Sequence, residues 1–290
     1  MADGRLGGGW HLGGREVPRL GLGAMRLPGD GVLGPPKDRD EAIAVLRTAV
    51  ELGVRHIDTA DFYGPHVANE LIREALAPYP DDLVVATKVG VVRTARGGWP
   101  NADRPEQLRE QVHENLRTLG VDVLDVVNLR NRTAADRVTI EPGSIAERFE
   151  ALAAMREEGL IRDLGVSAVD AQQVAEARTI APVVCVQNFS NLANRGDDDL
   201  VSQLADDEIA WVPYFPLGGF TPLQSEALQR VAAEVGASTP AVAAAWLLQH
   251  APNVLLIPGT SSVQHLRENV AAASLELPPE AVAELDAIAG

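Results

Sequence analysis

The chain of 290 residues is 46% hydrophobic with a mean hydropathy of −0.02, so it is long and apolar enough to bury the core of one α/β barrel. Its formal net charge of −16 and pI of about 4.8 argue against nucleic acid or a membrane surface as a partner, because both require excess positive charge. The single cysteine, Cys185, excludes an intrachain disulfide and fits a reducing cytoplasm, and no apolar run has the length of a signal peptide core or a membrane span.

Apolar runs and amphipathic segments alternate along the chain. A glycine-rich start suits a short hairpin from Trp10 to Val17. Strands are predicted at residues 20–25, 56–60, 83–89, 123–129, 163–168, 183–189, 209–215 and 254–257. Helices are predicted at residues 41–52, 70–76, 105–119, 145–158, 171–178, 223–234 and 240–249. Pro105 suits a first helical turn and Gly120 a helix end, which supports these boundaries.

This alternation implies right-handed crossovers and a parallel sheet. Eight such units predict a (β/α)8 TIM barrel with a short N-terminal β-hairpin, and we expect residues 1–290 to form a single domain. An open doubly wound sheet is the alternative. It is less favoured because residues 21–26 lack the third glycine of the dinucleotide-binding fingerprint and no helix follows them at once.

Polar residues stand where four predicted strands stop. Asp58 and Tyr63 follow the second strand, Lys88 ends the third, and Arg130 ends the fourth. In a barrel of parallel strands these ends meet at one mouth, where active sites are built. The pattern therefore predicts an enzyme.

Tyr63 is the candidate acid. A phenol has a pKa of about 10, which a nearby cation lowers by favouring phenolate. Lysine is rare here, since Lys37 and Lys88 are the only lysines among 25 basic residues, so Lys88 at a strand end indicates a specific role. We expect Lys88 to lower the pKa of Tyr63 toward neutrality, with Asp58 as its counter-ion. A structural ion pair beside a tyrosine is the alternative.

The sequence resembles the aldo-keto reductases over almost its whole length. The matching motifs, in order, are residues 57–60 and 62–64, Thr87-Lys88, Gln187-Asn188, residues 214–219, and residues 257–259 through Glu268-Asn269. The resemblance implies a barrel that binds NADPH without a Rossmann domain and reduces aldehydes or ketones. The mouth loops at residues 32–39, 61–67, 124–130 and 215–225 are similar to those of bacterial pyridoxal reductases.

The resemblance assigns the catalytic roles. Tyr63 would protonate the carbonyl oxygen while NADPH delivers hydride, and Lys88 and Asp58 would tune Tyr63. The family usually has a histidine where Arg130 stands, five residues after an aspartate that matches Asp125. A guanidinium stays protonated, so Arg130 can polarise a carbonyl or hold an anionic or phenolic oxygen but cannot exchange a proton. A salt-bridge role for Arg130 is the alternative.

The resemblance also implies a cofactor site. Ser167 and Gln187 match residues that bind the nicotinamide carboxamide, but the asparagine expected next is Ala168, which Asn188 or a water could replace. Tyr214 matches the residue that stacks on the nicotinamide, or else packs in the barrel wall. The other implied positions are Gly23, Ala24, Met25, Asp58, Phe215, Pro216, Leu217, Gly218, Gly219, Gly259, Thr260, Ser261, His265, Glu268 and Asn269. Their glycine N–H groups and a following helix N-terminus suit phosphate.

Three functions remain open. Pyridoxal reduction suits a pocket of Arg130, Phe62, Trp99 and Phe220 beneath a loop at residues 35–36, and His66 could touch substrate. Reduction of a secondary-metabolite carbonyl is a second reading, because Ala168 and residues 131–140 depart from the expected pattern. A low-turnover NADPH sensor is the third. We expect no metal, because no His, Cys and carboxylate grouping has zinc-ligand spacing, and we expect a monomer or small homo-oligomer that binds a small carbonyl compound.

Overall fold

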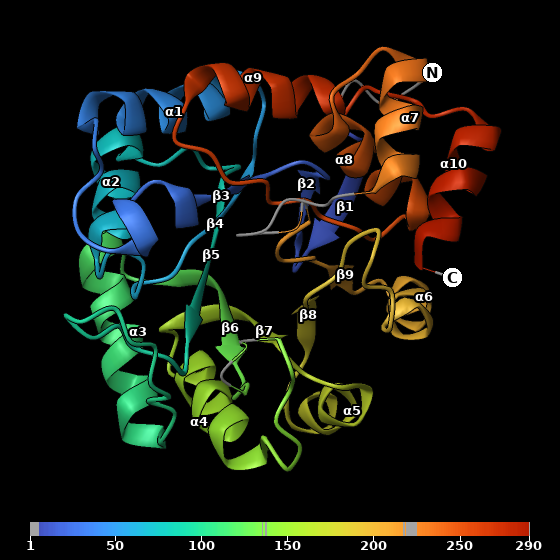
Figure 1. Cartoon of the computed structure of the whole chain (residues 1–290). Helices are drawn as coiled ribbons and strands as arrows, with labels where there is room; N and C mark the ends of the chain where they lie inside the picture. Colours follow the sequence, from blue (N-terminus) through green and yellow to red (C-terminus); the bar gives the residue numbers. More distant parts are fainter. Residues whose placement is uncertain (1–5, 135, 137, 217, 219–224, 290) are drawn as a thin grey trace.

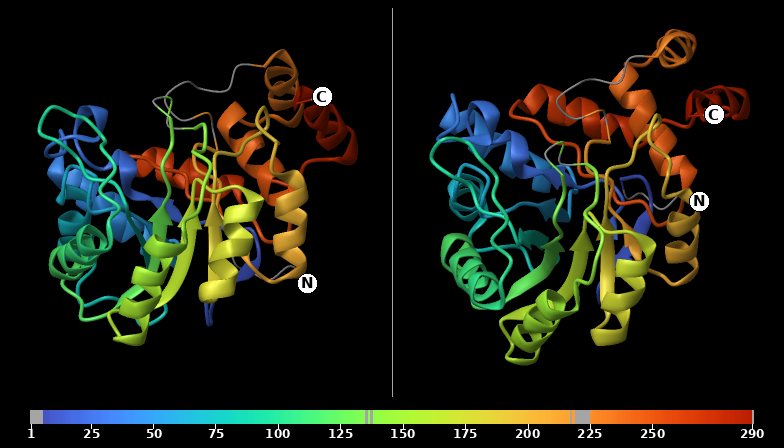
Figure 2. Two further views of the ribbon diagram at one scale, coloured as in Figure 1. Left: turned by 90° about the horizontal axis from the view of Figure 1, so that it is seen from below. Right: turned by 60° about the horizontal axis from the view of Figure 1, so that its bottom comes forward.

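The computed structural model describes residues 6–289 apart from 135, 137, 217 and 219–224 (Figure 1). In the described part of the chain, seven parallel strands pair in chain order. They are β3 (Leu22–Gly23), β4 (His56–Asp58), β5 (Val84–Val89), β6 (Leu124–Arg130), β7 (Ile161–Ser167), β8 (Val183–Gln187) and β9 (Ala210–Trp211). Figure 2 shows the green and yellow-green strand arrows pointing toward the same end of the molecule.

Residues 254–257 close the sheet into a barrel. They form isolated parallel bridges rather than a continuous strand, with Val254 paired to Trp211 of β9 and Leu256 paired to Leu20. Gly21 N–H donates to the Leu256 carbonyl at 2.7 Å, and Leu255 N–H donates to the Trp211 carbonyl at 2.8 Å. The last predicted strand therefore joins the first and seventh, which confirms the TIM barrel and excludes an open sheet.

The helices surround the strands (Figure 1). They are α1 (Arg39–Glu51), α2 (Val67–Leu76), α3 (Pro105–Leu119), α4 (Ala146–Glu157), α5 (Ala171–Ile180), α6 (Asp198–Asp206), α7 (Glu226–Val235), α8 (Thr239–His250), α9 (Val263–Ala272) and α10 (Pro279–Asp286). Short 3-10 turns lie at Ala24–Arg26, Asp30–Val32 and Ala287–Ala289. Pro105 begins α3, and Gly120 ends it with φ of 69°, as the sequence predicted. No single described helix has the length and apolarity to cross a membrane, although α7 and α8, bent by 93° at their break, meet the criterion as a pair.

The predicted hairpin covers the start of the barrel. Strand β1 (Gly9–Leu12) pairs antiparallel with β2 (Arg15–Pro18). Leu12 and Val17 pack in one interior cluster with Val84, the first residue of β5. Arg15 from the hairpin forms an ion pair with Asp125 of β6 at 3.0 Å. The hairpin thus fills the end where strands begin, and the barrel opens where they finish.

Candidate active site

A cavity of about 530 Å³ lies at the carboxyl ends of the strands and gathers residues from much of the barrel. The predicted site residues that line it are Gly23, Met25, Asp58, Tyr63, Lys88, Arg130, Ser167, Gln187, Tyr214, Phe215, Pro216 and Gly259. Phe62 and Trp99 of the predicted substrate pocket line it too. The structure therefore brings the proposed catalytic residues together with the residues matched to the nicotinamide end of a cofactor.

Lys88 and Asp58 form a buried ion pair beside Tyr63. Lys88 Nζ lies 2.5 Å from Asp58 Oδ1, and these two residues are each 5% exposed. Nζ also donates to the Thr59 carbonyl at 2.9 Å and lies 5.2 Å from the centre of the Tyr63 ring. The second carboxylate oxygen of Asp58 accepts from Gln187 Nε2 at 2.9 Å. Adjacent strand ends β4 and β5 supply the pair, so sheet register fixes its geometry.

The expected pKa shift of Tyr63 is wrong in direction. Burial raises the pKa of Tyr63 above its usual value, and the charge of Lys88 offsets this effect only in part. Asp58 adds a negative charge that also raises the pKa of Tyr63. For Lys88, burial alone would lower the pKa, but the carboxylate of Asp58 raises it above the ordinary value. At neutral pH the site therefore holds a protonated phenol and a charged ammonium.

Arg130 ends β6 and lines the cavity. Its guanidinium carbon lies 5.0 Å from the centre of the Tyr214 ring, and its Nη1 donates to Ser167 Oγ at 3.3 Å. The guanidinium thus lies between a proposed cofactor-stacking ring and a proposed carboxamide-binding hydroxyl. From this place it can donate hydrogen bonds into the cavity.

Gln187 offers an acceptor that suits a nicotinamide carboxamide. Its Nε2 is committed to Asp58, while its buried Oε1 has no hydrogen-bond partner among the described residues. A buried acceptor without a partner costs about 1–3 kcal/mol, which a ligand N–H donor would recover. The hydroxyl of Ser167, which is fully buried, lines the same cavity. These side chains fit the amide group of a nicotinamide.

Asn188 does not replace the asparagine missing at Ala168. Its Nδ2 donates to the Val169 carbonyl at 2.7 Å and to Asp197 Oδ2 at 3.0 Å, while its Oδ1 accepts from Val169 N–H at 3.0 Å. Both ends of the amide are therefore used to hold the chain after β7. Ala168 itself has φ of 56°, a left-handed conformation that turns the chain out of the strand.

The predicted adenosine-side residues lie outside the main cavity. Ser261, His265 and Glu268 are exposed around the start of α9, and Glu268 borders a shallow depression on that helix. Thr260 is buried, with its hydroxyl accepting from Ser262 N–H at 3.1 Å. One N–H at the N-terminus of α9 is already occupied, because Val263 N–H donates to Glu41 Oε1 at 2.8 Å.

The glycine-rich segment after β9 is described in part. Phe215 has φ of 56°, and Gly218 N–H donates to the Phe215 carbonyl at 3.0 Å. The N–H of Gly218, predicted to face a pyrophosphate, is thus used within the turn. Leu217, Gly219 and Phe220 lie outside the described residues.

Two other expectations about the pocket are wrong. Residues 35 and 36 do not line the cavity, and neither does His66. His66 Nδ1 instead lies 2.8 Å from Asp61 Oδ1, and this hydrogen bond raises the pKa of His66. Arg26, Asn101 and Thr133 also line the cavity but were not predicted from the sequence. They lie in loops and turns, and hydrophobic periodicity does not predict the path of a loop. Among the described residues, no group of three or more His, Cys, Asp or Glu could hold a metal ion.

The chain is similar to proteins of one family. The model of the aldo/keto reductase family matches residues 19–289. The pyridoxine 4-dehydrogenase of Escherichia coli K12 is 57% identical over 277 residues, which cover 96% of each chain. A thermostable aldo-keto reductase solved with the inhibitor epalrestat is 30% identical, with a TM-score of 0.80 over 97% of this chain and 99% of that one. An aldo/keto reductase of Klebsiella pneumoniae solved with NADP and acetate is 26% identical, with a TM-score of 0.76 over 94% and 92%.

Proposed function

The chain belongs to the aldo/keto reductase family, and on this basis we propose that it reduces aldehydes or ketones with NADPH, with pyridoxal, reduced to pyridoxine, as the favoured substrate. The observation that carries the proposal is the buried Lys88–Asp58 pair beside Tyr63 in the wall of a cavity. A tyrosine beside a buried lysine–aspartate pair can act as a general acid that protonates a carbonyl oxygen.

The cofactor would lie along the residues matched to it. Ser167, Gln187 and Tyr214 would hold the nicotinamide end, with Gln187 Oε1 accepting from the carboxamide. When bound, NADPH supplies hydride to a carbonyl carbon. The remaining set would hold the rest of the dinucleotide: Gly23, Ala24, Met25, Phe215, Pro216, Leu217, Gly218, Gly219, Gly259, Thr260, Ser261, His265, Glu268 and Asn269.

Tyr63 is the proton donor in this proposal. Its raised pKa keeps the phenol protonated at neutral pH, ready to give its proton to the carbonyl oxygen as negative charge develops there. The ammonium of Lys88 then stabilises the phenolate that is left. Asp58 keeps Lys88 charged inside the barrel. The aromatic rings of Phe62 and Trp99 line the cavity beside Tyr63.

Pyridoxal suits the substrate side of the cavity. Its planar ring can pack against Trp99 and Phe62, which meet edge to face with centroids 5.5 Å apart. Its phenolic oxygen, acidic beside the pyridine nitrogen, can accept from Arg130, which cannot lose its own proton. The high identity to the pyridoxine 4-dehydrogenase of E. coli supports the same choice.

The cellular setting belongs to the same proposal. We propose a single-domain monomer or small homo-oligomer in the cytoplasm.

Cys185 has no role in the proposed chemistry. Burial raises the pKa of Cys185 to about 12, so its thiol is unreactive and serves as a small apolar side chain.

The test follows NADPH absorbance with pyridoxal and with a panel of other aldehydes and ketones. Wild type should turn over pyridoxal with the highest kcat/KM, and Tyr63→Phe should lose turnover while NADPH still quenches protein fluorescence. Tyr79→Phe is the matched control, because the Tyr79 hydroxyl donates to the Leu119 carbonyl and does not line the cavity. Turnover of other carbonyls only would assign a different substrate. Tight NADPH binding without turnover would favour a sensor.

A further inference from the structure

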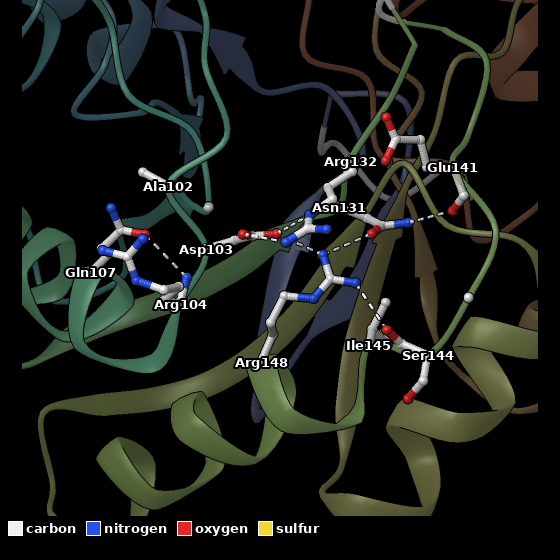
Figure 3. Close-up of polar contacts among 12 residues, drawn as sticks. Ala102, Asp103, Arg104, Gln107, Asn131, Arg132, Glu141, Ser144, Ile145 and Arg148 are labelled. Carbon is white, nitrogen blue, oxygen red and sulfur yellow. Dashed lines mark hydrogen bonds and ion pairs between the residues drawn. The ribbon is translucent and has the colours of Figure 1, made fainter.

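A buried carboxylate outside the catalytic group joins two arginines (Figure 3). Asp103, 4% exposed, accepts from Arg132 at 2.7 and 2.9 Å and from Arg148 at 2.9 Å. Arg148 Nη1, which binds Asp103, also donates to Asn131 Oδ1 at 3.0 Å. Arg148 Nη2 donates to the Ser144 carbonyl at 3.1 Å. We call Asp103, Arg132 and Arg148 the Asp103 clamp. None of the three lines the cavity, so none is placed to touch a substrate.

The clamp joins the bases of two loops that form the substrate side of the cavity. The loop of residues 90–104, after β5, places Trp99 and Asn101 on the cavity wall, and Asp103 lies near its end. The loop of residues 131–145, after β6, places Thr133 on the wall, and Arg132 lies near its start. Arg148 comes from the first turn of α4.

Each loop is held internally by its own backbone bonds. In the first, Ala102 N–H donates to the Gly90 carbonyl at 2.9 Å, and in the second, Glu141 N–H donates to the Arg132 carbonyl at 3.0 Å. The β5–β6 ladder that supports both loops ends at the pair of Val89 and Leu129. Beyond that point, the clamp provides an ionic connection between the loop that carries Trp99 and the loop that carries Thr133.

The charges favour a rigid connection. Burial by itself raises the pKa of Asp103, but the hydrogen bonds and charges of Arg132 and Arg148 lower it below the ordinary value. The carboxylate is therefore ionised throughout the neutral range. Arg132 holds it with two parallel bonds, a geometry that fixes orientation as well as distance.

We infer that Asp103 is a positioning residue that sets the width of the substrate pocket and thereby the preference for bulky ring aldehydes over small ones. The inference rests on the proposed function, because it concerns the same cavity. A small aldehyde needs only Tyr63 and the cofactor, whereas a ring substrate needs both walls at a fixed separation. Loss of the clamp therefore affects the ring substrate selectively.

The test compares kcat/KM for pyridoxal and for propanal in Asp103→Asn, which keeps the shape of the side chain and removes its charge. We expect kcat/KM to fall about tenfold for pyridoxal, mostly through KM, and less than about twofold for propanal. Asp103→Glu, which keeps the charge, should recover part of the preference. Hydrogen exchange should speed up at residues 90–104 and 131–145 while β5 and β6 keep their protection.

Glu158→Gln is the matched control. Glu158 binds Arg109 with two bonds at 2.5 and 2.6 Å, and that pair also joins α3 to the end of α4, but it lies exposed and away from the cavity. This variant should change neither the substrate preference nor exchange in the two loops.

Two results for Asp103→Asn would overturn the inference: an equal loss of kcat/KM for pyridoxal and propanal, or unchanged hydrogen exchange in the two loops. Either result would mean that the clamp is only a structural ion pair. If wild type reduces other carbonyls but not pyridoxal, the proposed substrate fails, and benzaldehyde replaces pyridoxal in the comparison. If wild type reduces no carbonyl, the proposed function fails, and the exchange measurement alone decides whether the clamp holds the loops.

Discussion

Gln187 donates from Nε2 to Asp58 Oδ2 at 2.9 Å and keeps its other amide atom, Oε1, free of any partner among the described residues. One side chain thus touches the catalytic ion pair and presents an acceptor to the cavity. Gln187 therefore joins the Lys88–Asp58 ion pair to the proposed nicotinamide end of the cavity.

Gln187→Ala should weaken NADPH binding about tenfold, because the acceptor for the carboxamide is lost at roughly 0.5–1.5 kcal/mol per hydrogen bond and Asp58 loses a partner. Fluorescence titration with NADPH measures the change. Gln203→Ala, on the exposed side of α6, is the control and should bind NADPH as wild type does. Unchanged affinity in Gln187→Ala would remove this residue from the cofactor site.

Lys88→Met should reduce both stability and turnover. Removing one partner of a buried ion pair costs on the order of 3–5 kcal/mol, because Asp58 stays buried and charged. Thermal unfolding measures this loss. The double variant Asp58→Asn/Lys88→Met should regain much of the Tm but not the activity, since the phenolate of Tyr63 has no cation. Recovery of activity in the double variant would contradict the role of Lys88.

The pH profile of reduction follows from the raised pKa of Tyr63. The proton donor is competent below its pKa, and burial places that pKa above the ordinary value of 10.0. We expect kcat for reduction to stay level from neutral pH into the alkaline range and to fall only when Tyr63 loses its proton. Stopped-flow absorbance across pH measures this. A fall of kcat centred near pH 7 would instead support the lowered pKa of Tyr63 that was expected from the sequence.

The cofactor preference should respond to Glu41. Its carboxylate accepts from Val263 N–H at the start of α9, the helix that also carries His265. Glu41→Gln keeps an acceptor and removes a negative charge, so the preference for NADPH over NADH should rise about two- to fivefold. The ratio of kcat/KM for the two cofactors measures it, with Glu51→Gln at the far end of α1 as control. An unchanged cofactor preference in Glu41→Gln would indicate that the 2′-phosphate binds away from Glu41.

His56 should make the fold sensitive to acid. Burial lowers the pKa of His56 from 6.5 to about 4. Between these pH values the unfolded chain binds a proton at His56 and the folded chain does not. Stability from this residue is complete above pH 6.5 and is lost as the pH falls toward 4. Urea unfolding of wild type and His56→Asn between these pH values should give a shallower slope for the variant. Parallel slopes would show that His56 titrates normally.

Much of the barrel could be predicted from sequence, because parallel strands buried on both faces read as apolar runs and amphipathic helices as periodic ones. Helix α3 begins at Pro105, as its proline indicated. Helix α10 was missed because it is short, and α6 was given no bounds from the sequence. The strand at residues 254–257 is reduced to bridges, a detail set by barrel closure rather than by composition.

The site was predictable where it lies at strand ends and not where it depends on loops. Asp58, Lys88 and Arg130 end strands, so topology alone brings them together. The pKa of Tyr63 could not be read from spacing, because it depends on how deeply Trp99 and Phe62 bury the phenol. Asp103 gave no signal in the sequence, since its two arginines are brought to it by the paths of separate loops.

We propose that this protein transfers hydride from NADPH to a carbonyl carbon with Tyr63 as acid. The most direct measurement incubates the protein with pyridoxal and NADPH deuterated at C4 and analyses the product by mass spectrometry. We expect pyridoxine carrying one deuterium at the former aldehyde carbon with wild type and with Tyr79→Phe, and almost none with Tyr63→Phe. Bound NADPH that stays unoxidised in wild type, or equal deuterium transfer in Tyr63→Phe, would contradict it.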